Sequence, residues 1–127
     1  MKNNVVGWFE VPVSDMERAI KFYETVFDFT LNRQKMDELD MAWFPWQDDG
    51  SGAPGSLVHN PAFYNPSHDG TLVYFTAHSG DLSNELARVE SAGGKVIVPK
   101  QQISPEHGYM AVLEDSEGNR IALHSNA

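Results

Sequence analysis

The sequence contains no cysteine, which excludes disulfides, thiolate catalysis and thiolate metal sites together. Basic residues are also scarce, because nine Lys and Arg stand against eighteen Asp and Glu, for a net charge of −9. Without clusters of positive charge, the chain is a poor match for nucleic acid or for an anionic membrane surface. We therefore expect it to act on a small molecule or on another protein, with neither nucleic acid nor membrane as a partner.

Long apolar runs are missing as well, and none approaches the length of a membrane span. The opening segment, MKNNVVGW, lacks the charged-then-apolar layout of a signal peptide. These features predict a soluble cytoplasmic protein. The serines lie scattered in turns, and none sits in a G-x-S-x-G context, so the sequence does not indicate a serine nucleophile.

What the sequence does have is one strand–helix–strand pattern that occurs twice. In the first copy, a β-rich stretch precedes an amphipathic helix that ends near Phe27, and three further strands follow. The predicted strands of this copy are 5–13, 29–33, 41–46 and 55–59. Pro12 donates no ladder hydrogen bond, which places that end of the strand at a sheet edge or at the strand's exit. Ser14 and Glu17 have the spacing of a capping box at the start of the helix.

The second copy repeats this order after a linker rich in Pro and Gly, 60–70. Asp81 is expected to cap its helix, which Gly93 and Gly94 would stop. Its predicted strands are 71–77, 95–98, 109–113 and 120–124, with a loop at 99–107 and a tight turn at 115–119. The prediction is an α+β fold of two β-α-β-β-β modules, about 4–60 and 70–126, within one domain, 1–127.

The order and spacing of these motifs resemble the vicinal oxygen chelate (VOC) superfamily, which includes glyoxalase I, bleomycin-resistance proteins and extradiol dioxygenases. The resemblance rests on Val13-Ser14-Asp15, the Phe22–Tyr23 pair, Gly93–Gly94 and the closing stretch from Asp115 to His124. It implies paired β-α-β-β-β modules whose curved mixed sheets enclose a cleft, commonly completed in a homodimer.

The resemblance also implies where a metal would be bound. In metal-dependent members, His, Gln or Glu side chains in the cleft hold one divalent ion. Two of those ligand positions correspond here to Trp8 and Ala122, and the others fall near Ser56 and near Leu72 and Tyr74. Indole and methyl groups offer no lone pair to such a cation. A metal-independent cleft is therefore expected, with a displaced site at Glu10, His59 and His124 as the alternative.

The candidate ligand-binding residues are those expected on the cleft-facing side of the strands: Trp8, Glu10, Trp43, Tyr74, Ala122 and His124. Glu10 is a candidate general base or a partner for a cationic ligand, but a solvated strand end is an equal alternative. His124 comes two residues after Ala122 and so faces the same side of the strand, but an ordinary surface position is also compatible with it. The aromatic residues fit a cavity wall, or else core or dimer packing.

Three functions follow from these residues. The first is a metal-independent binding protein of the glyoxalase/bleomycin-resistance type, for a small, partly aromatic or cationic molecule. The second is a metal-dependent enzyme related to lactoylglutathione lyase, with isomerase, lyase or dioxygenase-type chemistry on a small oxygenated substrate. The third is a dimeric interaction module with a vestigial pocket.

Overall fold

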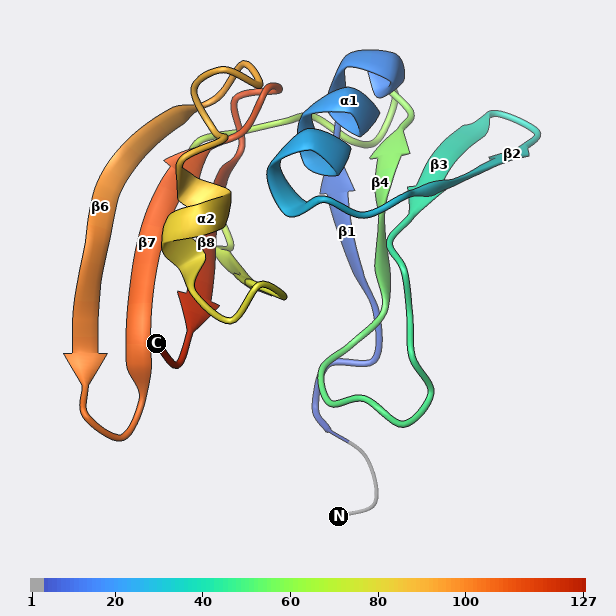
Figure 1. Cartoon of the computed structure of the whole chain (residues 1–127). Helices are drawn as coiled ribbons and strands as arrows, with labels where there is room; N and C mark the ends of the chain where they lie inside the picture. Colours follow the sequence, from blue (N-terminus) through green and yellow to red (C-terminus); the bar gives the residue numbers. More distant parts are fainter. Residues whose placement is uncertain (1–3) are drawn as a thin grey trace.

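Two four-stranded sheets, each accompanied by one helix, form the fold (Figure 1). A computed structural model describes residues 4–127, except for the side chain of Met36. The first module consists of β1 (Phe9–Pro12), α1 (Met16–Phe27), β2 (Asn32–Met36), β3 (Leu39–Trp43) and β4 (Gly55–His59). The second module consists of β5 (Val73–Thr76), α2 (Leu82–Leu86), β6 (Lys95–Ser104), β7 (Gly108–Glu114) and β8 (Arg120–Ser125).

Both modules have the same topology. The strand order is β1-β4-β3-β2 in one sheet and β5-β8-β7-β6 in the other. In each sheet the first strand pairs in parallel with the last, and the remaining pairs are antiparallel. The predicted β-α-β-β-β repeat is thus confirmed, and β1 is an edge strand, one of the two positions that Pro12 indicated.

The hydrophobic core lies between the helix-bearing faces of the two sheets. Phe75 of β5 contacts Phe44, which follows β3, and Tyr23 of α1, with ring centroids 5.3 and 5.8 Å apart. The two helices contact each other between the sheets (Figure 1). Because side chains alternate along a strand, every second residue points away from this core. We call the side of each sheet that bears those residues its open face.

Helix α1 contacts both modules, which explains its wide buried stripe of Met16, Ala19, Phe22, Tyr23, Val26 and Phe27. The ring of Phe22 lies against Gly94, where an added Cβ would come within 2.6 Å of it. Gly94 is therefore required for close packing of α1 on the second module, rather than only for ending a helix.

The start of α1 differs from the expectation. Asp15 is the N-cap and accepts a hydrogen bond from the backbone N–H of Arg18. The backbone N–H groups of Ser14 and Asp15 donate to Oε1 of Glu117, at 2.8 and 2.9 Å. The predicted capping box of Ser14 and Glu17 is wrong, because an acceptor from the second module takes these donors.

Several predicted boundaries are also wrong. Strand β1 begins at Phe9 rather than residue 5, β2 and β3 lie at 32–36 and 39–43, and α2 ends at Leu86 before a series of turns. The loop predicted at 99–107 is largely strand, because β6 continues to Ser104. Strand β6 lies at an edge and its register shifts repeatedly, so Pro99 displaces no ladder donor.

The turn between β7 and β8 fastens the two modules together. Tyr23 Oη donates to Asp115 Oδ2 at 2.6 Å, and Arg18 Nε donates to Glu117 Oε2 at 2.7 Å. Burial raises the pKa of Asp115, although its hydrogen bonds oppose this. Burial also acts to raise the pKa of Glu117, but hydrogen bonds from Arg18 and from the start of α1 outweigh it and lower the pKa to about 2. We call Asp115 and Glu117 with their partners the intermodule latch.

Candidate functional site

The open face of the first sheet carries a row of three polar or aromatic side chains on neighbouring strands. Glu10 of β1 pairs with Ser56 of β4, and Ser56 pairs with Trp43 of β3. Paired residues share a face, so all three point away from the core. Trp8 precedes Glu10 by two residues and lies on the same side. The structure thus brings together three of the predicted residues, Trp8, Glu10 and Trp43.

Trp8 and Trp43, together the indole pair, meet edge to face. Their ring centroids are 6.1 Å apart and the planes are inclined by 82°. Since β4 lies between β1 and β3, the two rings meet above β4, where Ser56 is located. The rings remain 42% and 38% exposed, so the pair has a surface that a ligand can contact. An aromatic pair of this geometry suits a planar or cationic group.

Glu10 is half-buried and accepts two hydrogen bonds within the protein. Trp8 Nε1 donates to Oε2 at 3.2 Å, and Tyr64 Oη donates to Oε1 at 2.7 Å. The hydrogen bond to Glu10, with a smaller contribution from burial, raises the pKa of Tyr64, so its hydroxyl stays a donor. Each carboxylate oxygen has a second lone pair available for a further donor.

Tyr64 was not among the residues predicted from the sequence. It comes from the linker between the modules, where backbone hydrogen bonds to Asn60 form a short turn. Neither strand nor helix periodicity applies to such a segment. The one available signal is an aromatic pair, Phe63–Tyr64, in an otherwise polar linker, with Phe63 left 81% exposed.

Ser56 is fully buried, and its hydroxyl has no hydrogen-bond partner among residues 4–127. Leaving a buried hydroxyl unpaired costs about 1–3 kcal/mol, and few such groups occur in folded proteins. The corresponding residue of the second module is Ala122, which has no hydroxyl. The row therefore contains a polar atom that is unused by the fold and lies next to a carboxylate.

The other three predicted residues lie on the open face of the second sheet. Tyr74 of β5 pairs with Ala122 of β8, and Ala122 with Val112 of β7, which repeats the row of the first sheet. Tyr74 is 51% exposed, whereas Ala122 is fully buried. His124 donates from Nε2 to the backbone carbonyl of His107, at 2.6 Å.

The alternative metal site is not assembled within one chain. His59 pairs with Asp40 and shares the face of Leu57, so it points to the opposite side of the sheet from Glu10. His124 belongs to the other sheet. Within residues 4–127, no three His, Asp or Glu side chains are placed to hold a metal ion. In that same range, no helix is long and apolar enough to cross a bilayer.

A hollow of about 710 Å³ lies beside the segment that precedes Trp8, and neither ring of the indole pair is among its lining residues. Residues 4–7, which directly precede Trp8, form one side, and Trp46, Asp48 and Pro54 are among the residues on the other side. Pro54 accepts a hydrogen bond from the backbone N–H of Phe9, which fixes this loop beside β1.

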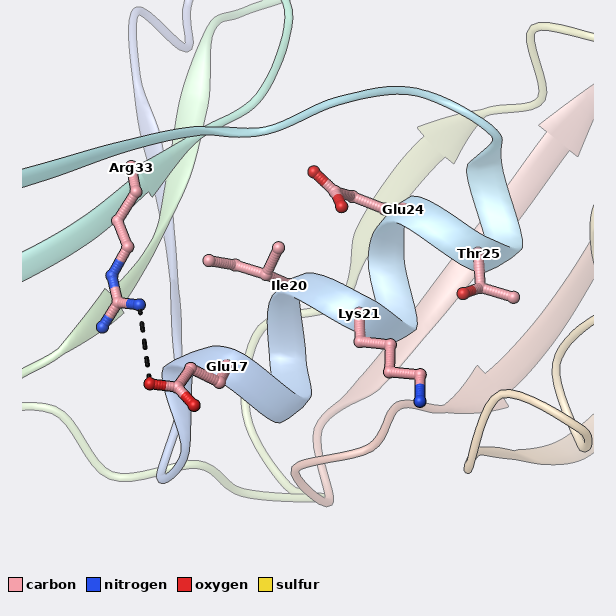
Figure 2. Close-up of a pocket in the computed structure, with 6 residues that line it drawn as sticks. All are labelled: Glu17, Ile20, Lys21, Glu24, Thr25 and Arg33. Atoms are coloured by element: carbon pink, nitrogen blue, oxygen red, sulfur yellow. Dashed lines mark ion pairs between the residues drawn. The ribbon is translucent and has the colours of Figure 1, made fainter.

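A second hollow, of about 410 Å³, lies between α1 and β2, on the other side of the sheet (Figure 2). Three of its charged groups, Glu17, Glu24 and Arg33, already have partners, and the fourth, Lys21, is exposed. Arg33 pairs with Asp40 at 2.6 Å and with Glu17 at 3.9 Å, and Glu24 accepts from the backbone of Leu31. The hydrogen bond to Asp40 raises the pKa of Arg33 above its ordinary value, so its guanidinium stays charged. We interpret this groove as ordinary surface.

The fold and the open-faced sheets define the class of protein. The model of the Glyoxalase/Bleomycin resistance protein/Dioxygenase superfamily matches residues 5–123, and the chain belongs to that superfamily. The resemblance found in the sequence is therefore confirmed. No curated protein matches the sequence significantly.

Solved structures agree in fold. A domain from Frankia sp. EAN1pec is 15% identical, with a TM-score of 0.72 over 99% of this chain and 100% of that one. TnmS3, an antibiotic binding protein from Streptomyces sp. CB03234, is 28% identical, with a TM-score of 0.64 over 100% and 99%. Glyoxalase I from Zea mays is 20% identical, with a TM-score of 0.68 over 94% of this chain and 45% of that one. The chain thus spans less than half the length of the maize enzyme.

Proposed function

We propose that the protein binds a small, partly aromatic cation on the open face of its first sheet, without a metal ion. The observation that carries this proposal is the position of Glu10, a carboxylate beside two partly exposed indole rings. Aromatic faces attract cations and planar rings, and the carboxylate supplies the opposite charge. A net charge of −9 further favours a cationic ligand over an anionic one.

The residues at the metal-ligand positions support metal independence. Trp8 and Ala122 carry no donor atom that would bind a divalent cation, and Ser56 and Tyr74 are weak neutral ligands. TnmS3 supports the binding role, since it has the same length and is described as an antibiotic binding protein. In this proposal Glu10 binds charge and does not move a proton.

The proposal includes a second copy of the chain. The two open faces of one chain point away from their common core, so Tyr74, Ala122 and His124 do not face the indole pair of the same chain. We infer that a homodimer places the second-module open face of one copy over the first-module open face of the other. Exposed aromatic rings on both faces, 38–51% accessible, are consistent with such a contact.

Tryptophan fluorescence tests this function. Benzamidine and phenyltrimethylammonium should quench the emission saturably, benzoate should not, and EDTA should leave both titrations unchanged. Trp46→Phe keeps the indole pair and serves as the control, with unchanged affinity expected. Preferential binding of benzoate would contradict the proposal. A large metal-specific rise in melting temperature would instead favour the metal-dependent lyase.

A further inference from the structure

We propose that Ser56 and Glu10 together recognise a planar nitrogen cation that carries N–H donors, such as an amidinium or guanidinium group. This inference rests on the proposed function and specifies the ligand class for the same face. It separates cations that donate hydrogen bonds from quaternary ammonium ions, which offer charge alone.

The unpaired hydroxyl of Ser56 is the first argument. Its side chain is fully buried and yet lies beside a carboxylate on the open face, with no partner among the described residues. Neighbouring parallel strands lie about 4.8 Å apart, so one planar group can reach both Glu10 and Ser56. A hydroxyl oxygen accepts N–H hydrogen bonds, and it gains nothing from a cation whose nitrogen carries only methyl groups.

The donors that now occupy Glu10 are the second argument. One N–H, from Trp8, and one O–H, from Tyr64, each occupy one lone pair on the two oxygens of Glu10. An amidinium or guanidinium group carries two parallel N–H donors and matches a carboxylate in the same way, with full positive charge. A group that displaces the indole N–H from Oε2 releases the ring of Trp8. The contact between the rings of Trp8 and Trp43, which meet above β4 where Ser56 is located, can then open.

The second module shows that the fold does not need this hydroxyl. Ala122 occupies the position of Ser56 in the equivalent row and is equally buried. Ser56→Ala therefore tests recognition without disturbing the sheet. Ser125→Ala is the matched control, because the buried Ser125 hydroxyl accepts from the backbone N–H of Leu82 and donates to the Ala127 carbonyl.

The experiment compares benzamidine with phenyltrimethylammonium, which share a ring and a charge but differ in N–H donors. We expect the wild-type protein to bind benzamidine about tenfold more tightly, a difference of about 1.4 kcal/mol. Ser56→Ala should remove most of this preference, leave phenyltrimethylammonium affinity unchanged and keep or raise the melting temperature. Ser125→Ala should lower the melting temperature and keep the preference.

The outcomes separate the two proposals. If both cations bind equally well and Ser56→Ala changes neither affinity, recognition by Ser56 is overturned while the binding function stands. If neither cation binds the folded wild-type protein, the proposed function fails and this inference fails with it. Loss of affinity for both probes in Ser56→Ala would show a general change of the face and would also overturn the specific role.

Discussion

The two sheets have the same topology but very different open faces. In the first sheet the central row is Glu10, Ser56 and Trp43, and in the second it is Tyr74, Ala122 and Val112. Their helix-bearing faces, by contrast, are alike in being apolar and buried. The core face thus fixes the fold, and the open face of either module is free to acquire a separate role. We assign ligand recognition to the first.

The helix starts show a second asymmetry. Each helix is capped by the Asp directly before it, Asp15 or Asp81, but at α1 the backbone N–H groups of Ser14 and Asp15 also donate to Glu117 of the other module. Lys100 pairs with Asp81 within the second module. The start of α1 is therefore completed by a side chain of the second module, whereas the start of α2 is satisfied within its own module.

Removing the intermodule latch should have the largest effect. Glu117→Ala leaves the Arg18 guanidinium and the backbone N–H groups of Ser14 and Asp15 without their acceptor, which should lower the free energy of unfolding by about 2–3 kcal/mol. Asp81→Ala, at an exposed cap, is the matched variant and should cost less. Urea denaturation followed by circular dichroism measures both. Equal losses would contradict the asymmetry between the two helices.

The intermodule latch also makes the free energy of unfolding depend on pH. The folded pKa of Glu117, about 2, lies below its ordinary value of 4.5, so its contribution is complete above about pH 4.5 and is lost as pH falls toward 2. Asp115 acts in the opposite direction, because its folded pKa is raised. Glu117→Gln should therefore flatten the fall in urea midpoint between about pH 5 and pH 2. An unchanged acid slope in this variant would count against the latch.

Removing one polar group from each open face compares the two faces directly. Glu10→Gln should weaken benzamidine binding by about tenfold or more, because it removes the charged acceptor of the proposed ion pair. Tyr74→Phe removes only a hydroxyl from the second sheet and should change the affinity by less than about twofold. Isothermal titration calorimetry gives both constants. If Tyr74→Phe weakened binding more than Glu10→Gln, ligand recognition would belong to the second sheet.

Exchanging the central residues of the two rows should shift stability in opposite directions. Ser56→Ala removes an unpaired buried hydroxyl and should stabilise the protein by about 1 kcal/mol, or a few degrees in melting temperature. Ala122→Ser introduces such a group and should destabilise it by about 1–2 kcal/mol. Differential scanning calorimetry resolves changes of this size. Destabilisation by both substitutions would indicate that Ser56 has a structural partner.

The smallest effect is expected at Tyr64, which has no equivalent on the second sheet. Tyr64→Phe frees one oxygen of Glu10 from an internal donor and should strengthen benzamidine binding by about two- to threefold. The same titration measures it. A tenfold loss would instead mean that Tyr64 contacts the ligand or holds Glu10 in its binding position.

The sequence was sufficient for features that depend on neighbouring residues. The buried stripe of α1, the cap at Asp81 and the turn around Gly118 all follow from local spacing, and all are present. The parity of the first strand was also enough to place Trp8 and Glu10 on one face. Trp43 was selected from the concentration of aromatic residues, and these three residues form one cluster in the structure.

Contacts between distant residues were beyond such rules. Glu117 is 103 positions from Ser14, and Tyr64 is 54 positions from Glu10, so neither partnership leaves a periodic signal. Continuation of β6 through Pro99 was missed because an edge strand with shifted register tolerates proline. Joining both residue sets into one cleft overlooked that the open faces of a chain point apart.

The most direct test of the account follows the three indole N–H signals in a ¹H–¹⁵N spectrum while benzamidine is added. Trp8 and Trp43 should shift saturably with one dissociation constant, and Glu10→Gln should abolish both shifts. Shifts confined to Trp46, or to backbone amides of the groove between α1 and β2, would place the ligand elsewhere. Either result would contradict ligand recognition by the open face of the first sheet.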